Sequence, residues 1–171
     1  LLHEARLELQ EQGYAFDPNM PLGGMIEVPA AALAIEDLGV HLDFMSVGTN
    51  DLLQYSLAAD RVDEQVAHLL DPLHPGIVRL LQLIFTSGSA LGIPVTVCGE
   101  MAGDRRCTRL LLALGLRSFS MHPGRILEVK QVITETHIGK AAAALAHWGN
   151  MGVQRNEVSL LRLLDQSQAV N

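Results

Sequence analysis

The sequence predicts an α/β protein built on a parallel β-sheet. Four short apolar segments each precede a helical segment, and they lie at residues 24–28, 40–48, 93–98 and 116–121. Strands that alternate with helices in this way are typical of a parallel sheet with right-handed crossovers. The composition agrees, because 49% of the residues are hydrophobic but only 4% are aromatic. Aliphatic residues of this kind fill strands that helices cover.

Start and stop signals or apolar periodicity define the predicted helices. Pro29 and Gly39 bound one helix, and the cap-type residues Thr49, Asn50 and Asp51 open the next. Further helices are predicted at residues 1–13, 77–92, 104–115 and 123–136. Two prolines and several charges predict an irregular segment between 61 and 76.

Two parts are expected along the chain. Residues 1–136 form the α/β domain, and residues 137–171 form an extension of one or two amphipathic helices with a fraying tail. The chain opens directly with a helical pattern and has no methionine before it. We therefore expect it to be the middle of a longer protein.

Two architectures fit the alternation of strands and helices. One is an open, doubly wound sheet, and the other is part of a (β/α)₈ barrel. A complete barrel typically needs about 250 residues and eight strands. The chain has 171 residues and four predicted strands, so its length slightly favours the open sheet.

Charge and composition exclude several function classes. A net charge of −7 and a pI near 5.4 argue against a nucleic-acid partner, which requires a basic surface. The apolar stretches are much shorter than a membrane span, and no secretory leader opens the chain. Two cysteines make no disulfide framework. We expect a soluble, cytoplasmic protein with no membrane partner.

Candidate site residues lie where the predicted strands end, because ligands bind at the carboxyl ends of parallel strands. They are Glu27 after the first strand, Asn50 and Asp51 after the second, and Cys98 at the end of the third. Neighbouring strands lie roughly 4.8 Å apart, so Glu27 and Asp51 can converge on one hard cation such as Mg²⁺ or Mn²⁺. A helix N-cap explains Asp51 equally well, whereas the Glu27 carboxylate is costly unless it is paired.

Other polar residues have ordinary structural explanations. Arg61, taken alone, is typical of a solvated surface charge. The seven histidines have no metal-type spacing, and we expect structural roles for all of them. Cys107 lies inside a predicted helix and is expected to be buried and unreactive.

Four segments carry a specific resemblance to a known family. They are GGMIEVPAAAL, DFMSVGTNDLLQYSLAADR, DPLHPGIVRLL and VTVCGEMAGD. In this order they resemble enzyme I of the bacterial phosphoenolpyruvate:sugar phosphotransferase system, a phosphoenolpyruvate–protein phosphotransferase. The resemblance runs from about Gly23 to Glu135 and covers the C-terminal, phosphoenolpyruvate-binding domain of that family. Pyruvate phosphate dikinase and phosphoenolpyruvate synthase share the framework, but their loops after the cysteine look different.

The resemblance implies a fold and a set of residue roles. The family domain is a (β/α)₈ TIM barrel, so this chain would be its second half, strands five to eight, with extra C-terminal helices. Glu27 and Asp51 would bind Mg²⁺, and Asn50, Asp51 and Arg61 would form the substrate site. Cys98 would be the acid that protonates the enolate carbon to give pyruvate.

A neutral thiol is a plausible acid for this step. The reference pKa of cysteine is about 8.5, so the thiol is mostly protonated at neutral pH. A neighbouring negative charge disfavours the thiolate, and Glu100 is close in sequence. The segment GEMAGD is expected to form a loop over the site. The alternative for Cys98 is an ordinary core residue, since free cysteines are often buried.

The resemblance also implies protein partners and a phosphoryl acceptor that this chain does not contain. The family passes its phosphoryl group to a histidine on a separate N-terminal domain and then to the phosphocarrier HPr. No histidine here has the sequence context of that acceptor, so the chain alone is expected to be inactive. A homodimer is expected, because the family domain dimerises and a half-barrel has open sheet edges. Two alternatives remain: a non-catalytic assembly module, and a metal-dependent lyase or aldolase, which leaves Cys98 unexplained.

Overall fold

A single parallel sheet organises the computed structural model, which describes residues 1–168. Its strands are β1 (Gly23–Ile26), β2 (Phe44–Gly48), β3 (Val95–Cys98) and β4 (Ser118–Phe119), in the order β1-β2-β3-β4. All three pairings are parallel. The predicted α/β class with four parallel strands is confirmed.

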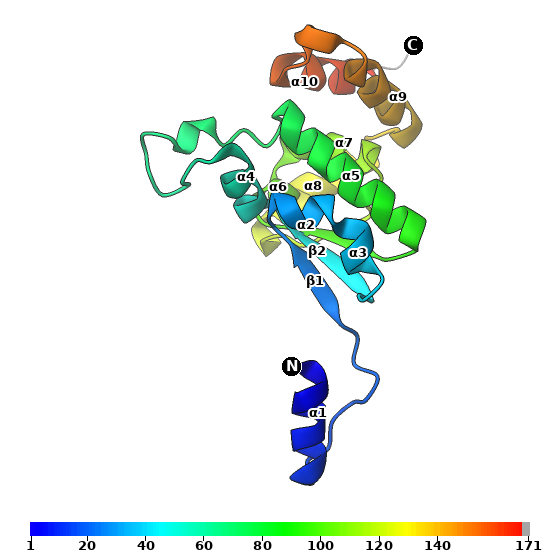
Figure 1. Cartoon of the computed structure of the whole chain (residues 1–171). Helices are drawn as coiled ribbons and strands as arrows, with labels where there is room; N and C mark the ends of the chain where they lie inside the picture. The colour runs from blue at the N-terminus through cyan, green and yellow to red at the C-terminus, as the bar shows by residue number, and fades with distance from the viewer. Residues whose placement is uncertain (169–171) are drawn as a thin grey trace.

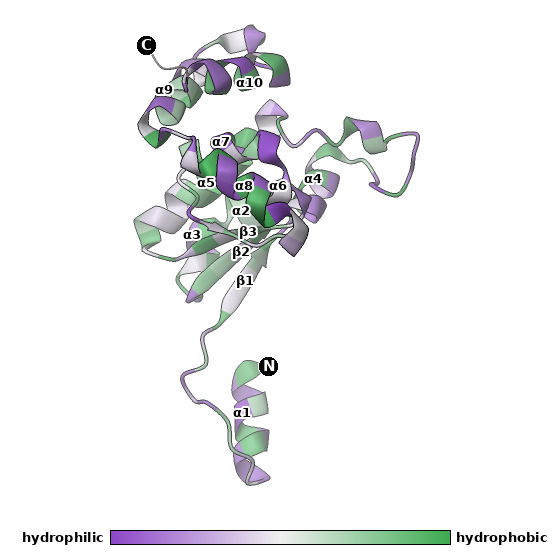
Figure 2. Cartoon of the chain, turned by 180° about the vertical axis from the view of Figure 1, so that it is seen from behind, coloured by the Kyte–Doolittle hydropathy of each residue, from purple (hydrophilic) through white to green (hydrophobic). Residues whose placement is uncertain are grey.

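The two faces of the sheet differ in cover. Side chains on one face are buried at 0–1% exposure and include Ile26, Met45, Val47 and Val97. The register places Met25, Ser46 and Thr96 side by side on the opposite face. There Met25 is 51% exposed and Phe44 is 43% exposed. We call this second face the uncovered face, because no helix within residues 1–168 packs on it (Figures 1 and 2).

Helices follow each strand as the sequence predicts. Those of the α/β part are α1 (Leu2–Glu11), α2 (Pro29–Leu33), α3 (Ile35–Gly39), α4 (Thr49–Leu57), α5 (Pro75–Leu91), α6 (Glu100–Gly103), α7 (Arg105–Ala113) and α8 (Ile126–Thr134). Short 3₁₀ turns η1 (Ala67–Leu69) and η2 (Pro123–Arg125) lie in the connections. Figure 1 shows α2, α3, α5, α7 and α8 stacked over the covered face of the sheet.

The strand order argues against one of the two predicted architectures. In a doubly wound sheet the order reverses at a switch point and helices cover both faces. The order here is consecutive, and within residues 1–168 every helix that packs on the sheet lies on the same face. The open doubly wound sheet that chain length favoured is therefore wrong. Chain length favoured the wrong architecture, because it carries no information about which face of the sheet the crossover helices cover.

Three elements differ locally from their predictions. The single helix predicted at 29–39 is two, α2 and α3, with a break at Ala34 that nothing in the local sequence explains. The fourth strand shrinks from 116–121 to two residues, because only Ser118 and Phe119 pair with β3. The segment GEMAGD forms the one-turn helix α6 rather than a loop, because Met101 and Ala102 enter the core.

The C-terminal extension consists of two helices joined by η3 (Gly152–Gln154). These helices, α9 (Ile138–Gly149) and α10 (Glu157–Gln166), pack on α7 and on each other. Trp148 and Leu160 lie in the same hydrophobic core as the sheet residues. The indole nitrogen of Trp148 donates to the Ser159 hydroxyl at 3.0 Å, which ties α9 to α10. Both helices lie on the helical side of the sheet, away from the uncovered face (Figure 1).

The N-terminal helix α1 stands apart from the rest of the molecule. A connecting segment carries it away from the sheet in both views (Figures 1 and 2). None of its residues is buried. Among residues 1–168, no helix has the length and apolar character needed to cross a membrane.

Candidate functional site

The predicted site residues follow the carboxyl ends of three adjacent strands. Since the strands are parallel and consecutive, these ends meet at one edge of the sheet. Glu27 follows β1, Asn50 and Asp51 lie in the first turn of α4, and Cys98 is the last residue of β3. The structure thus gathers residues separated by about seventy positions in sequence at a single edge.

Cys98 lies on the uncovered face among polar and sulfur-containing neighbours. Its Sγ accepts a hydrogen bond from the Ser46 hydroxyl at 3.3 Å. The S–H can donate to the Val47 carbonyl oxygen at 3.4 Å, and Met25 Sδ lies 3.9 Å away. The neutral thiol therefore has an acceptor inside the protein. The predicted contribution of Glu100 stays a prediction, because Glu100 is not among these hydrogen-bonding partners.

Hydrogen bonds join the two loops on either side of the site. The Thr49 hydroxyl donates to the Cys98 carbonyl at 2.8 Å, and the Glu100 amide donates to Asn50 Oδ1 at 2.9 Å. Gly99 allows this approach, because a Cβ there would lie 2.6 Å from Thr49 Oγ1 and 2.8 Å from Asn50 Oδ1. Its φ of +93° also favours glycine. The turn after β3 is thus fixed by the first turn of α4.

The Glu27 carboxylate lies against the end of the neighbouring strand. A Cβ on Gly48 would lie 2.8 Å from Glu27 Oε2. Within residues 1–168, the Glu27 side chain forms no ion pair and no hydrogen bond. The partly buried Glu27 carboxylate therefore stands beside the start of α4 with free oxygen lone pairs.

Asp51 is not the helix cap that the sequence allowed. Helix α4 begins at Thr49 with Gly48 at the N-cap and no side-chain cap bond, so Asp51 lies inside the first turn. A carboxylate there complements the helix dipole. Arg61 Nη2 lies 3.9 Å from Asp51 Oδ1, and both side chains are partly exposed. Such a pair contributes little to stability, so both groups can bind a ligand at low cost.

A cavity of about 1150 Å³ lies at this edge of the sheet. Its lining includes the three predicted residues Asn50, Arg61 and Cys98, together with Gly99. Glu27 and Asp51 are not among the lining residues. The structure therefore brings Asn50, Arg61 and Cys98 to one cavity but leaves Asp51, also predicted to bind the substrate, outside its lining. The shared metal site of the two carboxylates stays a prediction.

Sequence reasoning missed several residues of the site. Ser46 donates a hydrogen bond to the Cys98 sulfur, and Arg105, Arg106, His122 and Arg125 line the cavity. The alternation of FMSVG could have identified Ser46. A period of two puts Ser46 on the face of the strand opposite to the buried side chains of Met45 and Val47. Nothing in the sequence places the arginines, since they reach the cavity from the loops and helices after β3 and β4.

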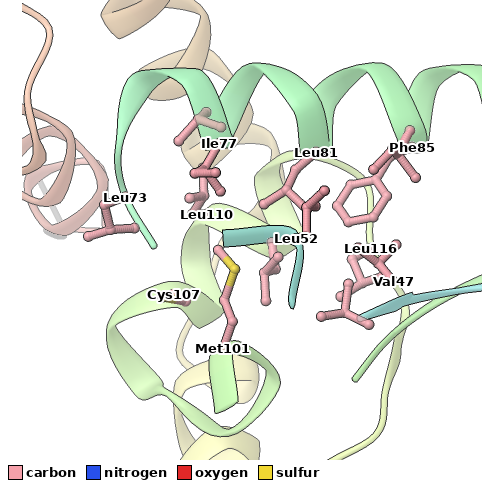
Figure 3. Close-up of a cluster of buried hydrophobic side chains, with 14 of the residues drawn as sticks. Val47, Leu52, Leu73, Ile77, Leu81, Phe85, Met101, Cys107, Leu110 and Leu116 are labelled. Atoms are coloured by element: carbon pink, nitrogen blue, oxygen red, sulfur yellow. The ribbon is translucent and has the colours of Figure 1, made fainter. Parts of the chain in front are cut away.

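Two titratable groups beside the site have shifted pKa values. Burial opposes ionisation of Asp104, but the hydrogen bonds and charge of Arg106 outweigh it and lower the pKa of that carboxyl. Asp104 also caps α7 by accepting from the Arg106 amide at 2.9 Å. Burial raises the pKa of the Cys107 thiol to about 12. Figure 3 shows Cys107 in the core near Met101, so its predicted burial is confirmed.

Three histidines whose side chains accept hydrogen bonds have structural roles, as predicted. His74, His122 and His137 are N-cap residues whose Nδ1 atoms accept from backbone amides. His122 does so while it also lines the cavity. Within residues 1–168, no group of three or more His, Cys, Asp or Glu side chains converges as a metal site would require.

Comparison with known proteins identifies the family. The model of the family described as PEP-utilising enzyme, PEP-binding domain, matches residues 1–138 (PEP is phosphoenolpyruvate). The chain belongs to the PEP-utilising enzyme family. The resemblance seen in the sequence is therefore confirmed, and its extent is larger than the span from Gly23 to Glu135.

Three curated relatives of this chain share the name phosphoenolpyruvate-protein phosphotransferase. The phosphoenolpyruvate-protein phosphotransferase of Cupriavidus necator is 53% identical over 137 residues, which cover 80% of this chain and 23% of the relative. The proteins of that name from Haemophilus influenzae and Staphylococcus carnosus are 40% and 42% identical over 82% and 78% of the chain. They are covered over 24% and 23% of their own length. The chain spans about a quarter of the length of the curated relatives it matches.

For a PEP-utilising enzyme, the residues at the sheet edge can be compared with those that a divalent cation requires. The donors present fit a hard cation, because Glu27 and Asp51 supply carboxylate oxygens at the start of α4. Glu27 has no competing basic partner in the described part of the chain, and Asp51 has only the long contact with Arg61. The glycine at position 48 leaves the space that the Glu27 carboxylate occupies.

Proposed function

We propose that this chain is the second half of a PEP-binding (β/α)₈ barrel, strands five to eight, in a phosphoenolpyruvate–protein phosphotransferase. The observation that carries the proposal is the meeting of Asn50, Arg61 and Cys98 in one cavity at the carboxyl edge of a parallel sheet. Consecutive strand order and cover on one face support a barrel segment, because crossovers in a barrel all place their helices outside.

Each side chain has a distinct task with the substrate. The guanidinium of Arg61 suits the phosphate or carboxylate of PEP, since its planar fork matches both groups. Asn50 is held by the Glu100 amide through Oδ1, which leaves its NH₂ group free to donate to the substrate. A cavity of about 1150 Å³ is ample for PEP and for an incoming imidazole.

The proposed reaction needs one acid in this half of the site. The bond between phosphorus and the enol oxygen breaks, and the phosphoryl group passes to a histidine on another part of the protein. The terminal carbon of the enolate takes the proton of Cys98 Sγ, which gives pyruvate and a thiolate. Solvent returns a proton to the thiolate. In the reverse direction the thiolate removes a proton from the methyl group of pyruvate.

Mg²⁺ or Mn²⁺ belongs to the proposal as cofactor. Glu27 and Asp51 are the residues that would hold it, and when bound it neutralises phosphate charge. HPr is the proposed final acceptor, reached through a histidine domain outside this chain. By itself the chain is expected neither to phosphorylate itself nor to turn over PEP, because phosphoryl transfer depends on positioning and charge neutralisation by the whole site.

The uncovered face supports a second candidate. A sheet face without cover and open strand edges favour pairing with another chain, so the isolated segment can be an assembly module rather than a catalyst. PEP-utilising enzymes such as pyruvate phosphate dikinase or phosphoenolpyruvate synthase are a third candidate, which shares the same site residues.

Proton exchange tests the role of Cys98 in the full-length protein. Cys98→Ala should stop exchange of pyruvate methyl protons with deuterated water while PEP binding persists. Cys107→Ala is the matched control, because that thiol is buried in the core, and its exchange rate should stay near the native value. Exchange at the native rate in Cys98→Ala would show that Cys98 is not the acid.

The metal assignment has its own test. Asp51→Ala in the full-length protein should abolish metal-dependent phosphoryl transfer and weaken Mn²⁺ binding, measured by titration. Asp60→Ala, an exposed aspartate of the loop after α4, serves as control and should retain both. Unchanged metal affinity in Asp51→Ala would remove Asp51 from the site.

A further inference from the structure

A second cavity, of about 510 Å³, lies between α5, α7 and α9. It shares no lining residue with the cavity at the sheet edge. The cavity exists because α9 presents Ala142, Ala146 and Gly149 at helical spacing, and these side chains are too small to fill the space beside α5. Its α9 wall follows residue 138, where the family match ends.

The lining has an apolar base and polar walls. Val78 and Trp148, at 1% and 2% exposure, contribute buried apolar surface, with Leu114 and Leu145 beside them. The polar lining residues are Arg79, Gln82, Thr86, Asn150 and Arg155. Small-molecule sites share this combination of apolar surface and a few polar groups, and their volumes are roughly 300–1,000 Å³.

The charge of the lining has one sign. Arg79 and Arg155 line the cavity, and no acidic residue does. Neither arginine forms an ion pair within the described part of the chain. Arg155 uses Nε to donate to the Gly152 carbonyl at 3.0 Å, which leaves its two terminal nitrogens as donors. The lining of this cavity is therefore positively charged, although the chain as a whole carries a net charge of −7.

We infer that this cavity binds a small organic anion, one with a carboxylate, phosphate or sulfonate group on an apolar body. Arginine donates two parallel hydrogen bonds to such groups, so the charged end belongs beside Arg79 or Arg155. The apolar body then lies against the partly exposed Leu114 and Leu145, and Trp148 lines the same cavity. The site is independent of the proposed function, because it uses none of the residues assigned to PEP.

Trp148 makes the site directly observable, because it is the only tryptophan of the chain. The test uses 1-anilinonaphthalene-8-sulfonate and its uncharged analogue N-phenyl-1-naphthylamine with the 171-residue chain. Energy transfer from Trp148 should saturate with the sulfonate at one equivalent per chain. The uncharged analogue should bind at least tenfold more weakly. Equal affinity for the two probes, or transfer that does not saturate, would overturn the proposal.

Substitutions locate the binding. The double variant Arg79→Gln/Arg155→Gln should weaken sulfonate binding at least tenfold, and circular dichroism checks that it folds. Arg162→Gln, an exposed arginine of α10 outside the lining, is the matched control and should bind as the native chain does. Ala146→Phe fills the hollow without changing charge and should also abolish binding. Native affinity in either the double variant or Ala146→Phe would overturn the proposal.

Discussion

At the scale of single residues, two cysteines in one chain have opposite environments. Cys98 is partly exposed at the edge of the sheet, whereas Cys107 is buried and its pKa is raised to about 12. Because the thiolate is the nucleophile, iodoacetamide at pH 8 should modify one thiol of the folded chain and two after denaturation. Mass spectrometry should place the first on Cys98. Modification of Cys107 in the folded chain would contradict this environment.

Gly99 offers a second prediction at this scale. An alanine there adds strain of about 1–3 kcal/mol, because its φ of +93° and ψ of −174° lie in a region used almost only by glycine, and its Cβ would clash with Thr49 and Asn50. Gly115→Ala is a matched control, because its φ is +103° but no atom lies within 4 Å of the added Cβ. Thermal melting should show a larger loss for Gly99→Ala. Equal losses of melting temperature in the two variants would mean that stability does not depend on the close approach of Gly99 to Thr49 and Asn50.

At the scale of elements, the start of α7 depends on Asp104. Its lowered pKa means that the ionised carboxylate stabilises the folded chain. That stabilisation is fully present above the ordinary pKa of about 3.9 and is lost as the pH falls through the lower folded value. Asp104→Asn should therefore reduce the free energy of unfolding by about 1 kcal/mol at pH 7, and the difference should shrink below about pH 4.

Chemical denaturation between pH 3 and pH 8 measures this difference. Asp37→Asn in α3 is the control, because Asp37 forms no ion pair or side-chain hydrogen bond in the described part of the chain. Its difference from the native chain should stay small at every pH. A difference for Asp104→Asn that is constant down to pH 3 would contradict the role of the ionised cap.

At the scale of the whole molecule, the uncovered face favours self-association. It carries Met25 and Phe44 at 51% and 43% exposure beside open strand edges. The face is mixed in polarity, since Ser46 and Thr96 share it with these apolar side chains. Sedimentation at micromolar concentration should show a dimer or larger species, and Phe44→Ser should weaken it. Leu127→Ser on α8, at a site 79% exposed, should not. A native monomer would contradict the prediction.

The sequence by itself determined the class, the order of strands and helices, and which residues lie at the strand ends. Local signals did this: apolar runs for the strands, Pro29 at the start of a helix, and the ordered motifs around Asn50 and Cys98 that define the PEP-utilising enzyme family. These signals work because backbone geometry ties side-chain direction to position over a few residues. They could not place Glu27 against Gly48, since that contact depends on which strands are neighbours.

Only the tertiary structure decided the rest. It placed α2, α3, α5, α7 and α8 on one face of the sheet, set Ser46 against the Cys98 sulfur and brought Arg125 into the cavity. It also turned GEMAGD into a helix, because burying Met101 and Ala102 stabilises the chain more than an exposed loop does. The physical reason is common to these cases. Strand order, burial and the approach of distant segments come from packing across the whole molecule, which no local pattern of residues records.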